Sequence, residues 1–168
     1  MSAAMKFIDA NHDRWQEVTA DDSLVAVPAA APWSLLSMTQ WQAVRASWPD
    51  SMPVGVIVPN DTDIETIEPD LARFALVALQ FPKWVDGRAY SQARLLRSRF
   101  GFAAEIRATG EVLADMLPLL ARTGFDAVSL RADQSVATAR RALGFFPGGH
   151  YQGDVLEPQP HFARRLAA

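Results

Sequence analysis

The sequence predicts a single-domain α/β protein whose core is a mainly parallel sheet of about five strands. Right-handed helical crossovers would join them in a Rossmann-like or flavodoxin-like three-layer arrangement. Three observations support this prediction. A chain of 168 residues suits one domain, and 49% hydrophobic with 21% charged residues is typical of globular proteins. From Pro53 onward, short apolar runs alternate with amphipathic segments. The short helical connections between these runs favour parallel pairing.

The chain divides into three stretches. Residues 1–22 are expected to form a short N-terminal hairpin or arm packed on the domain, and residues 23–146 the α/β core. Residues 147–168 are expected to form an extended C-terminal tail, because prolines and glycines recur there.

Apolar runs ended by proline or turn residues predict the strands, and helical periodicity predicts the helices. The expected strands are 24–27, 54–58, 74–79, 104–108 and 126–130. The expected helices are 37–48, 91–100, 111–122 and 133–143. Pro118 is expected to kink the third helix, because proline removes an internal N–H and crowds the preceding turn.

Composition limits the classes of function. The formal net charge of −3 argues against general affinity for nucleic acid or anionic membranes. The absence of cysteine excludes disulfides, thiolate nucleophiles and Cys-ligated clusters. No signal peptide and no long apolar stretch are visible, so a cytoplasmic location is expected. The three histidines lack metal-ligand spacing, so no metal site is expected: His12, His150 and His161.

Ligands of open parallel sheets bind beyond the carboxyl ends of the strands. Polar residues follow each predicted strand there: Asn60, then Lys83, Asp86 and Arg88, then Arg107 and Thr109, then Arg131. Arginine binds oxyanions through paired, planar hydrogen bonds. Arginines follow three of these four strand ends, and they therefore predict a site for a small anion or for an acidic partner surface.

A structural interpretation stands beside this functional one. Arginines at strand ends often pair with local carboxylates, and four are available: Asp61, Asp86, Glu111 and Asp133. Arg94 and Arg97 are interpreted more simply as a solvated helix face. Trp84 would either stack on a ligand or partner, or pack over the sheet edge.

The run from Phe81 to Ser91 with its continuation to Arg97, and above all its Asp-Gly-Arg-x-Tyr-Ser core, resembles the signature of a bacterial family, the domain-of-unknown-function family 934. The resemblance extends from about Leu24 to about Phe162. The family is labelled an oxidoreductase of sulfite reduction, through its association with sulfate-assimilation genes. The resemblance points to Asp86, Gly87, Arg88, Tyr90, Ser91, Arg94 and Arg107.

Some positions depart from the family pattern. Trp84-Val85 stands in place of Phe-Thr, Ala89 in place of glycine, and Thr123 in place of cysteine. Pro147-Gly148-Gly149 replaces a short strand, which affects the regularity of the last strand. The Asp-Gly-Arg turn itself is intact.

Three hypotheses for function follow. The first is an accessory or anion-binding protein of assimilatory sulfite reduction that binds an oxyanion or docks on sulfite reductase through the arginine edge. The second is an enzyme acting on a small anionic substrate, with Asp86 as general base and Tyr90 or Ser91 as proton donor. No cofactor is evident in the sequence, and a redox enzyme would need a non-covalent flavin or nicotinamide, or a partner that supplies electrons. The third is a structural subunit of a sulfite reductase complex. A homo-oligomer is compatible with all three.

Overall fold

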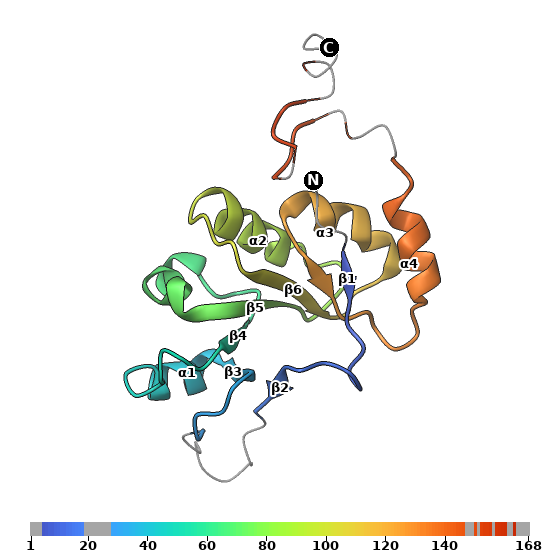
Figure 1. Cartoon of the computed structure of the whole chain (residues 1–168). Coiled ribbons are helices and arrows are strands. Elements are labelled where there is room, and N and C mark those ends of the chain that lie inside the picture. The colour runs from blue at the N-terminus through green and yellow to red at the C-terminus, as the bar shows by residue number, and fades with distance from the viewer. Residues whose placement is uncertain are drawn as a thin grey trace.

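The computed structural model describes residues 5–18, 28–146, 150, 152–155, 157–160 and 163. These residues form one parallel sheet with helices packed on it (Figure 1). The strands are β1 (Lys6–Phe7), β2 (Gln16–Glu17), β3 (Ser34–Ser37), β4 (Val54–Val58), β5 (Phe74–Phe81), β6 (Glu105–Gly110) and β7 (Ala127–Val128). The helices are α1 (Met38–Val44), α2 (Arg88–Ser98), α3 (Leu117–Thr123) and α4 (Val136–Leu143), with 3₁₀ segments η1 (Ile64–Arg73) and η2 (Ala114–Met116).

The predicted α/β class and the parallel sheet are confirmed. The strand order is β1-β7-β6-β5-β4-β3-β2, and every neighbouring pair is parallel. From β3 to β7 the strands lie side by side in chain order, without the reversal that divides a doubly wound sheet into two halves. The sheet has seven strands rather than about five. Four of the predicted strands correspond to β4, β5, β6 and β7, whereas β3 and the two-residue edge strands β1 and β2 were not predicted.

The prediction of an N-terminal hairpin within residues 1–22 is wrong. β1 pairs with β7 at one edge of the sheet, and β2 pairs with β3 at the other. A hairpin would need antiparallel pairing between β1 and β2, whereas the segment that joins them runs from one edge to the other (Figure 1).

The side chains of the strands alternate between two apolar clusters, one on each face of the sheet. On β5, Val77 and Leu79 join the larger cluster, which contains buried apolar residues from each described α-helix and 3₁₀ segment. Leu76 and Ala78 point the other way and join a smaller cluster. The helices therefore cover one face, and the second face, called here the helix-free face, is covered differently.

Trp15 covers the helix-free face, where it packs with Leu35, Leu76 and Ala78. Gly55 of β4 makes room for its indole, since a Cβ at that position would lie 3.1 Å from the Trp15 ring. Trp15 thus holds the N-terminal segment against the sheet by apolar contacts, although it lies outside the core predicted for residues 23–146.

The helix boundaries follow local signals. Ser37 caps α1 in a capping box with Gln40, so the helix predicted for 37–48 begins as expected and ends earlier, at Val44. Pro118 does not kink a helix: it stands in the first turn of α3, where a missing N–H has no cost. η2 forms a separate turn before it.

Two predictions lie largely outside the described residues. The strand expected at 24–27 lies completely outside the described residues, and so does much of the tail expected at 147–168. Among the tail residues that are described, Val155 donates its N–H to the carbonyl of Arg122 at 3.2 Å. No helix in the described part of the chain has the length and apolar character needed to cross a membrane.

Candidate functional site

The candidate site is the carboxyl edge of the sheet, defined here as residues 59–62 after β4, 82–88 after β5, 111–113 after β6 and 129–135 after β7. Since these four strands are parallel neighbours, all four segments leave the sheet at the same edge. The Asp86-Gly87-Arg88 turn, called here the signature turn, lies in the second segment.

Asp86 and Arg88 form a closed local unit in this turn. Asp86 Oδ1 accepts hydrogen bonds from the backbone nitrogen of Arg88 at 3.2 Å and from its Nε at 3.0 Å. Asp86 Oδ2 accepts a third from Nη2 at 2.7 Å. These bonds hold the pKa of Asp86 well below its usual range and raise the pKa of Arg88. Asp86 is therefore ionised at neutral pH, and both of its carboxylate oxygens already accept hydrogen bonds from Arg88.

Gln92 ties the first segment of the carboxyl edge to α2. Its Nε2 donates to the carbonyl oxygens of Pro59 and Thr62, each at 2.9 Å. Asn60 lies between these two anchors, is 7% exposed, and contributes to the lowered pKa of Asp86. Within the described residues, Asn60 Nδ2 and Gln92 Oε1 are buried without a hydrogen bond of normal geometry. The loop after β4 is thus fixed against the signature turn.

Tyr90 and Ser91 point to different surroundings. The Tyr90 ring packs edge-on against Phe81 and Phe125, with centroid distances of 5.1 and 6.5 Å. Burial, with a smaller contribution from the charge of Asp115, raises the pKa of Tyr90 to about 12. The Tyr90 hydroxyl therefore keeps its proton at neutral pH, and the ring contacts with Phe81 and Phe125 give Tyr90 a packing role. Ser91 is exposed on α2.

The tip of the loop after β5, residues 83–85, is exposed at the carboxyl edge and is called here the loop tip. Trp84 is 55% exposed and Val85 is 65% exposed, and Lys83 beside them is also exposed. Of the two interpretations of Trp84, this exposure favours contact with a ligand or partner. Large apolar side chains that remain exposed next to a charged residue are typical of contact surfaces.

Arg131 also lies at the carboxyl edge, in the segment after β7. Its Nε and Nη2 donate to the Asp133 carboxylate at 2.6 and 2.7 Å, and its Nη1 donates to Glu111 Oε2 at 2.7 Å. The Asp133 hydrogen bonds lower the pKa of that carboxyl to about 2 by stabilising its charged form. Because Glu111 follows β6, Arg131 also ties the ends of β6 and β7 together.

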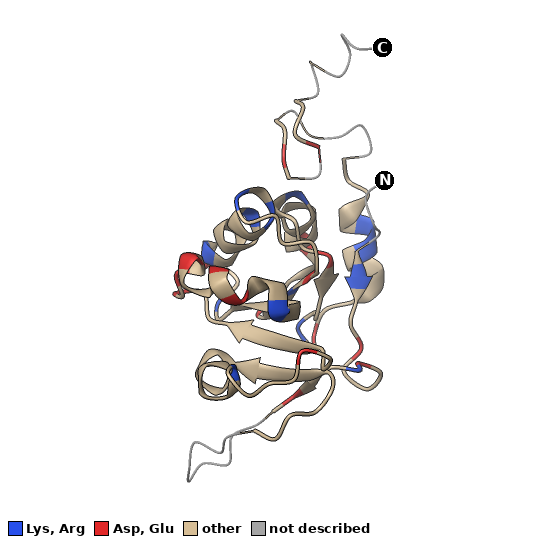
Figure 2. Cartoon of the chain, turned by 60° about the vertical axis from the view of Figure 1, so that its left-hand side comes forward, with Lys and Arg blue, Asp and Glu red and all other residues tan. Residues whose placement is uncertain are grey.

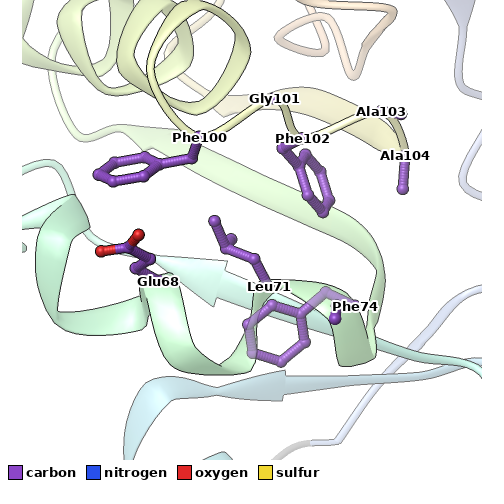
Figure 3. Close-up of a pocket in the computed structure, with 9 residues that line it drawn as sticks. Glu68, Leu71, Phe74, Phe100, Gly101, Phe102, Ala103 and Ala104 are labelled. Carbon is purple, nitrogen blue, oxygen red and sulfur yellow. The ribbon is translucent and has the colours of Figure 1, made fainter.

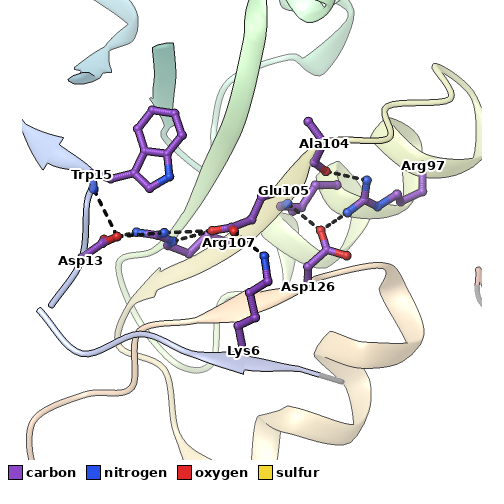
Figure 4. A network of polar contacts seen from close by, with 9 residues as sticks. Lys6, Asp13, Trp15, Arg97, Ala104, Glu105, Arg107 and Asp126 are labelled. Carbon is purple, nitrogen blue, oxygen red and sulfur yellow. Dashed lines mark hydrogen bonds and ion pairs between the residues drawn. The ribbon is translucent and has the colours of Figure 1, made fainter. Parts of the chain in front are cut away.

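Arg107 and Thr109 were predicted to lie beyond the end of a strand, and this prediction is wrong. β6 continues to Gly110, so both residues are inside the strand. Arg107 is 4% exposed, and its guanidinium binds the carboxylates of Asp13 and Glu105 (Figure 4). Thr109 Oγ1 donates to the carbonyl of Leu79 at 3.4 Å. The predicted strand ended at residue 108, two residues before the observed end at Gly110, so Thr109 was placed outside the strand and Arg107 at its end.

The prediction that the guanidinium groups of Arg88, Arg107 and Arg131 share one anion site is therefore wrong for Arg107. Arg88 and Arg131 remain at the same edge, in segments separated by the end of β6. Each of the three arginines is already paired with a carboxylate, so a bound anion would have to compete with Asp86, Asp133 and Glu111.

Arg97 was missed as an important residue. It was interpreted as part of a solvated helix face, but its guanidinium donates to the carbonyls of Phe102, Ala104 and Gly124 and to the Asp126 carboxylate. Arg94, by contrast, is exposed as predicted. The available signal was the sequence Phe125-Asp126 at the start of a strand, but spacing along the chain does not reveal a partner 29 residues away.

Fold and site together define a single-domain parallel α/β protein with an arginine–aspartate turn and an exposed aromatic loop tip at the carboxyl edge. In sequence comparisons, the model of the family described as "Bacterial protein of unknown function (DUF934)" matches residues 55–162, and the chain belongs to this family. The match includes the loop tip, the signature turn and all residues from β5 to α4. No curated protein matches the chain.

Proposed function

We propose that the protein is an accessory protein of assimilatory sulfite reduction that docks on a protein partner, sulfite reductase, through the loop tip. The observation that carries the proposal is the exposure of Trp84 and Val85 directly before the signature turn. Tryptophan is enriched among the residues that contribute most to binding energy in protein interfaces. The link to sulfite reduction comes from the resemblance of the signature to the bacterial family.

The rest of the carboxyl edge supports docking over catalysis. Gln92 and Asp86 hold the segments beside the loop tip in place, so a partner would meet a preformed surface. Basic and acidic residues are interspersed along the described chain (Figure 2). The edge itself mixes Lys83 and Arg88 with Asp61 and Asp86, which suits a mixed-charge protein surface.

Binding of a small oxyanion is the second candidate, because the Arg88 side chain is 57% exposed at the start of α2. It has less support, since the Asp86 carboxylate already fills the anion position of that guanidinium. An enzyme that uses Asp86 as general base has the least support, because the same ion pair occupies both oxygens of the Asp86 carboxylate.

The proposal is tested by biolayer interferometry with immobilised sulfite reductase and the full chain. We expect wild-type binding and a loss of about ten-fold or more in Trp84→Ala, as for a central interface residue. Phe145→Ala is the matched control, because Phe145 is 66% exposed at the end of α4, away from the carboxyl edge, and should bind like wild type.

Two results would contradict the proposal. One is the absence of wild-type binding to the reductase at micromolar concentration. The other is equal binding by wild type and Trp84→Ala. Titration with sulfite and sulfate, followed by the same titration of Arg88→Ala, addresses the anion candidate separately: binding that depends on Arg88 would favour that candidate over docking.

A further inference from the structure

A cleft of about 470 Å³ opens at the other end of the strands (Figure 3). It lies between η1 and residues 100–104, which lead into the amino end of β6, whereas the loop tip follows the carboxyl end of β5. Its lining consists of Glu68, Leu71, Ala72, Phe74 and residues 100–104. The cleft and the carboxyl edge are therefore separate features of the molecule.

Both walls of the cleft are held in place by long-range contacts. Arg97 binds the carbonyls of Phe102 and Ala104, which fixes the loop wall. On the opposite wall, Leu71 and Phe74 are buried in the main core. An ion pair between Arg99 and Glu65 joins the end of α2 to η1. The cleft is thus preformed, and a ligand would not have to order its walls.

The lining has an apolar body and one charged group. Phe74 and Phe102 line the cleft from the core and are only 4% and 6% exposed, whereas the Phe100 ring is partly exposed. Figure 3 shows the Glu68 carboxylate on the side of the cleft where Phe100 lies. Glu68 is exposed and forms no ion pair within the described part of the chain.

The nearby charges leave the cleft acidic. The guanidinium of Arg99 lies 5.4 Å from the Phe100 centroid and that of Arg97 lies 5.9 Å from the Phe102 centroid. Each arginine already has its own carboxylate, Glu65 for Arg99 and Asp126 for Arg97. The Glu68 charge therefore remains uncompensated at the mouth of the cleft.

We propose that this cleft binds a small aromatic cation, with its ring against Phe100 and its ammonium group at Glu68. The volume is in the range of sites for small molecules. The Phe100 ring provides offset or edge-to-face contacts to a ligand ring, and the open carboxylate selects positive over negative charge. The site is independent of the docking function, and either can fail without the other.

The probe is phenethylamine, titrated into the ¹⁵N-labelled full chain and followed by heteronuclear NMR. We expect saturable shifts at the amides of residues 100–104 with a dissociation constant of roughly millimolar size, as suits a ligand of few atoms. 3-Phenylpropionate has a similar shape and the opposite charge, and it should bind roughly five-fold more weakly.

Three variants make the test specific. Glu68→Gln should bring the two probes to similar affinity, while Glu17→Gln, which removes the same charge from β2, should leave their ratio unchanged. Ala72→Phe should weaken both probes, because Ala72 is an exposed lining residue and a phenyl group there fills the cleft without disturbing the core.

The proposal is overturned if phenethylamine causes no saturable shifts at residues 100–104. It is also overturned if wild type binds the amine and the acid equally, because the cleft would then be an apolar surface without charge selection. An unchanged preference for the amine in Glu68→Gln would assign the selectivity to another group and would reject the proposed site chemistry.

Discussion

The ion pairs of the carboxyl edge differ from those of the interior in both sequence separation and burial. At the edge, Arg88 and Arg131 each bind an aspartate two residues away, and their side chains are 57% and 33% exposed. In the interior, Arg107 binds Asp13 across 94 residues and is 4% exposed. Arg97 binds Asp126 across 29 residues and is 13% exposed.

This difference separates what builds the fold from what remains available for function. A pair between near neighbours can form in the unfolded chain as well, and exposed pairs contribute little to stability. A buried pair between distant segments exists only in the folded protein, and breaking it leaves a charge without compensation. Arg88 can therefore change partners at lower cost than the interior arginines, whereas Arg131, which also binds Glu111 across 20 residues, lies between the two groups.

The largest effect is expected for Arg107→Ala. The substitution leaves Asp13 and Glu105 close together without their shared cation, and it releases the N-terminal segment that Asp13 ties to β6 (Figure 4). We expect the free energy of unfolding to fall by about 4 kcal/mol. Urea unfolding followed by tryptophan fluorescence measures it.

Arg94→Ala is the matched control for this prediction. Arg94 is exposed on α2, and a change at such a surface position should cost less than about 0.5 kcal/mol. A loss below about 1 kcal/mol in Arg107→Ala would show that the buried cluster does not stabilise the fold, and the contrast between the two regions would disappear.

A smaller effect is expected for Gly124→Ala. Gly124 follows α3 at φ 102°, and a Cβ there would lie 2.5 Å from Arg97 Cγ. The backbone strain and the displacement of Arg97 together should cost about 2 kcal/mol. Gly101→Ala is the control, since Gly101 has φ 63° and no atom within 4 Å of an added Cβ; it should cost about 1 kcal/mol. Equal losses in urea unfolding would mean that Arg97 moves aside freely.

Local patterns predicted the parallel sheet, because Val54–Val58 and Phe74–Phe81 have apolar runs that a buried strand requires. The signature turn was also predictable, since Asp86 and Arg88 are two residues apart. Long-range features were not. Neither the path of β1 and β2 to opposite edges nor the partners of Arg107 and Arg97 leave a periodic signal in the chain.

The cleft illustrates the same limit. Phe100 and Phe102 look like ordinary core residues at the end of a helix, and Glu68 looks like an ordinary surface acid on η1. Only the packing of η1 against residues 100–104 brings them together, and that packing depends on Arg97. A site made of common residues from distant segments gives no motif to recognise.

Tyr90 allows a test of intermediate size that depends on pH. The unfolded chain releases this proton near pH 10, whereas the folded chain keeps it until about pH 12. Stability is therefore retained below pH 10 and declines as the pH rises from 10 to 12. Between pH 9 and pH 11, wild type should lose about 1 kcal/mol more than Tyr90→Phe, less than the full shift implies because the ring is half-buried. Parallel urea titrations measure this, and identical losses in the two proteins would contradict it.

The smallest effect on stability is expected for Arg88→Ala. Its guanidinium is mostly exposed, and Asp86 would still accept the hydrogen bond from the backbone nitrogen of residue 88, so the turn keeps its cap. The urea midpoint should equal that of wild type within error, and the double variant with Arg107→Ala should be additive, because the two arginines share no partner. If Arg88→Ala lowered the midpoint as far as Arg107→Ala, the signature turn would be part of the structural framework. Its arginine would then not be available to a partner or an anion without unfolding the edge that presents it.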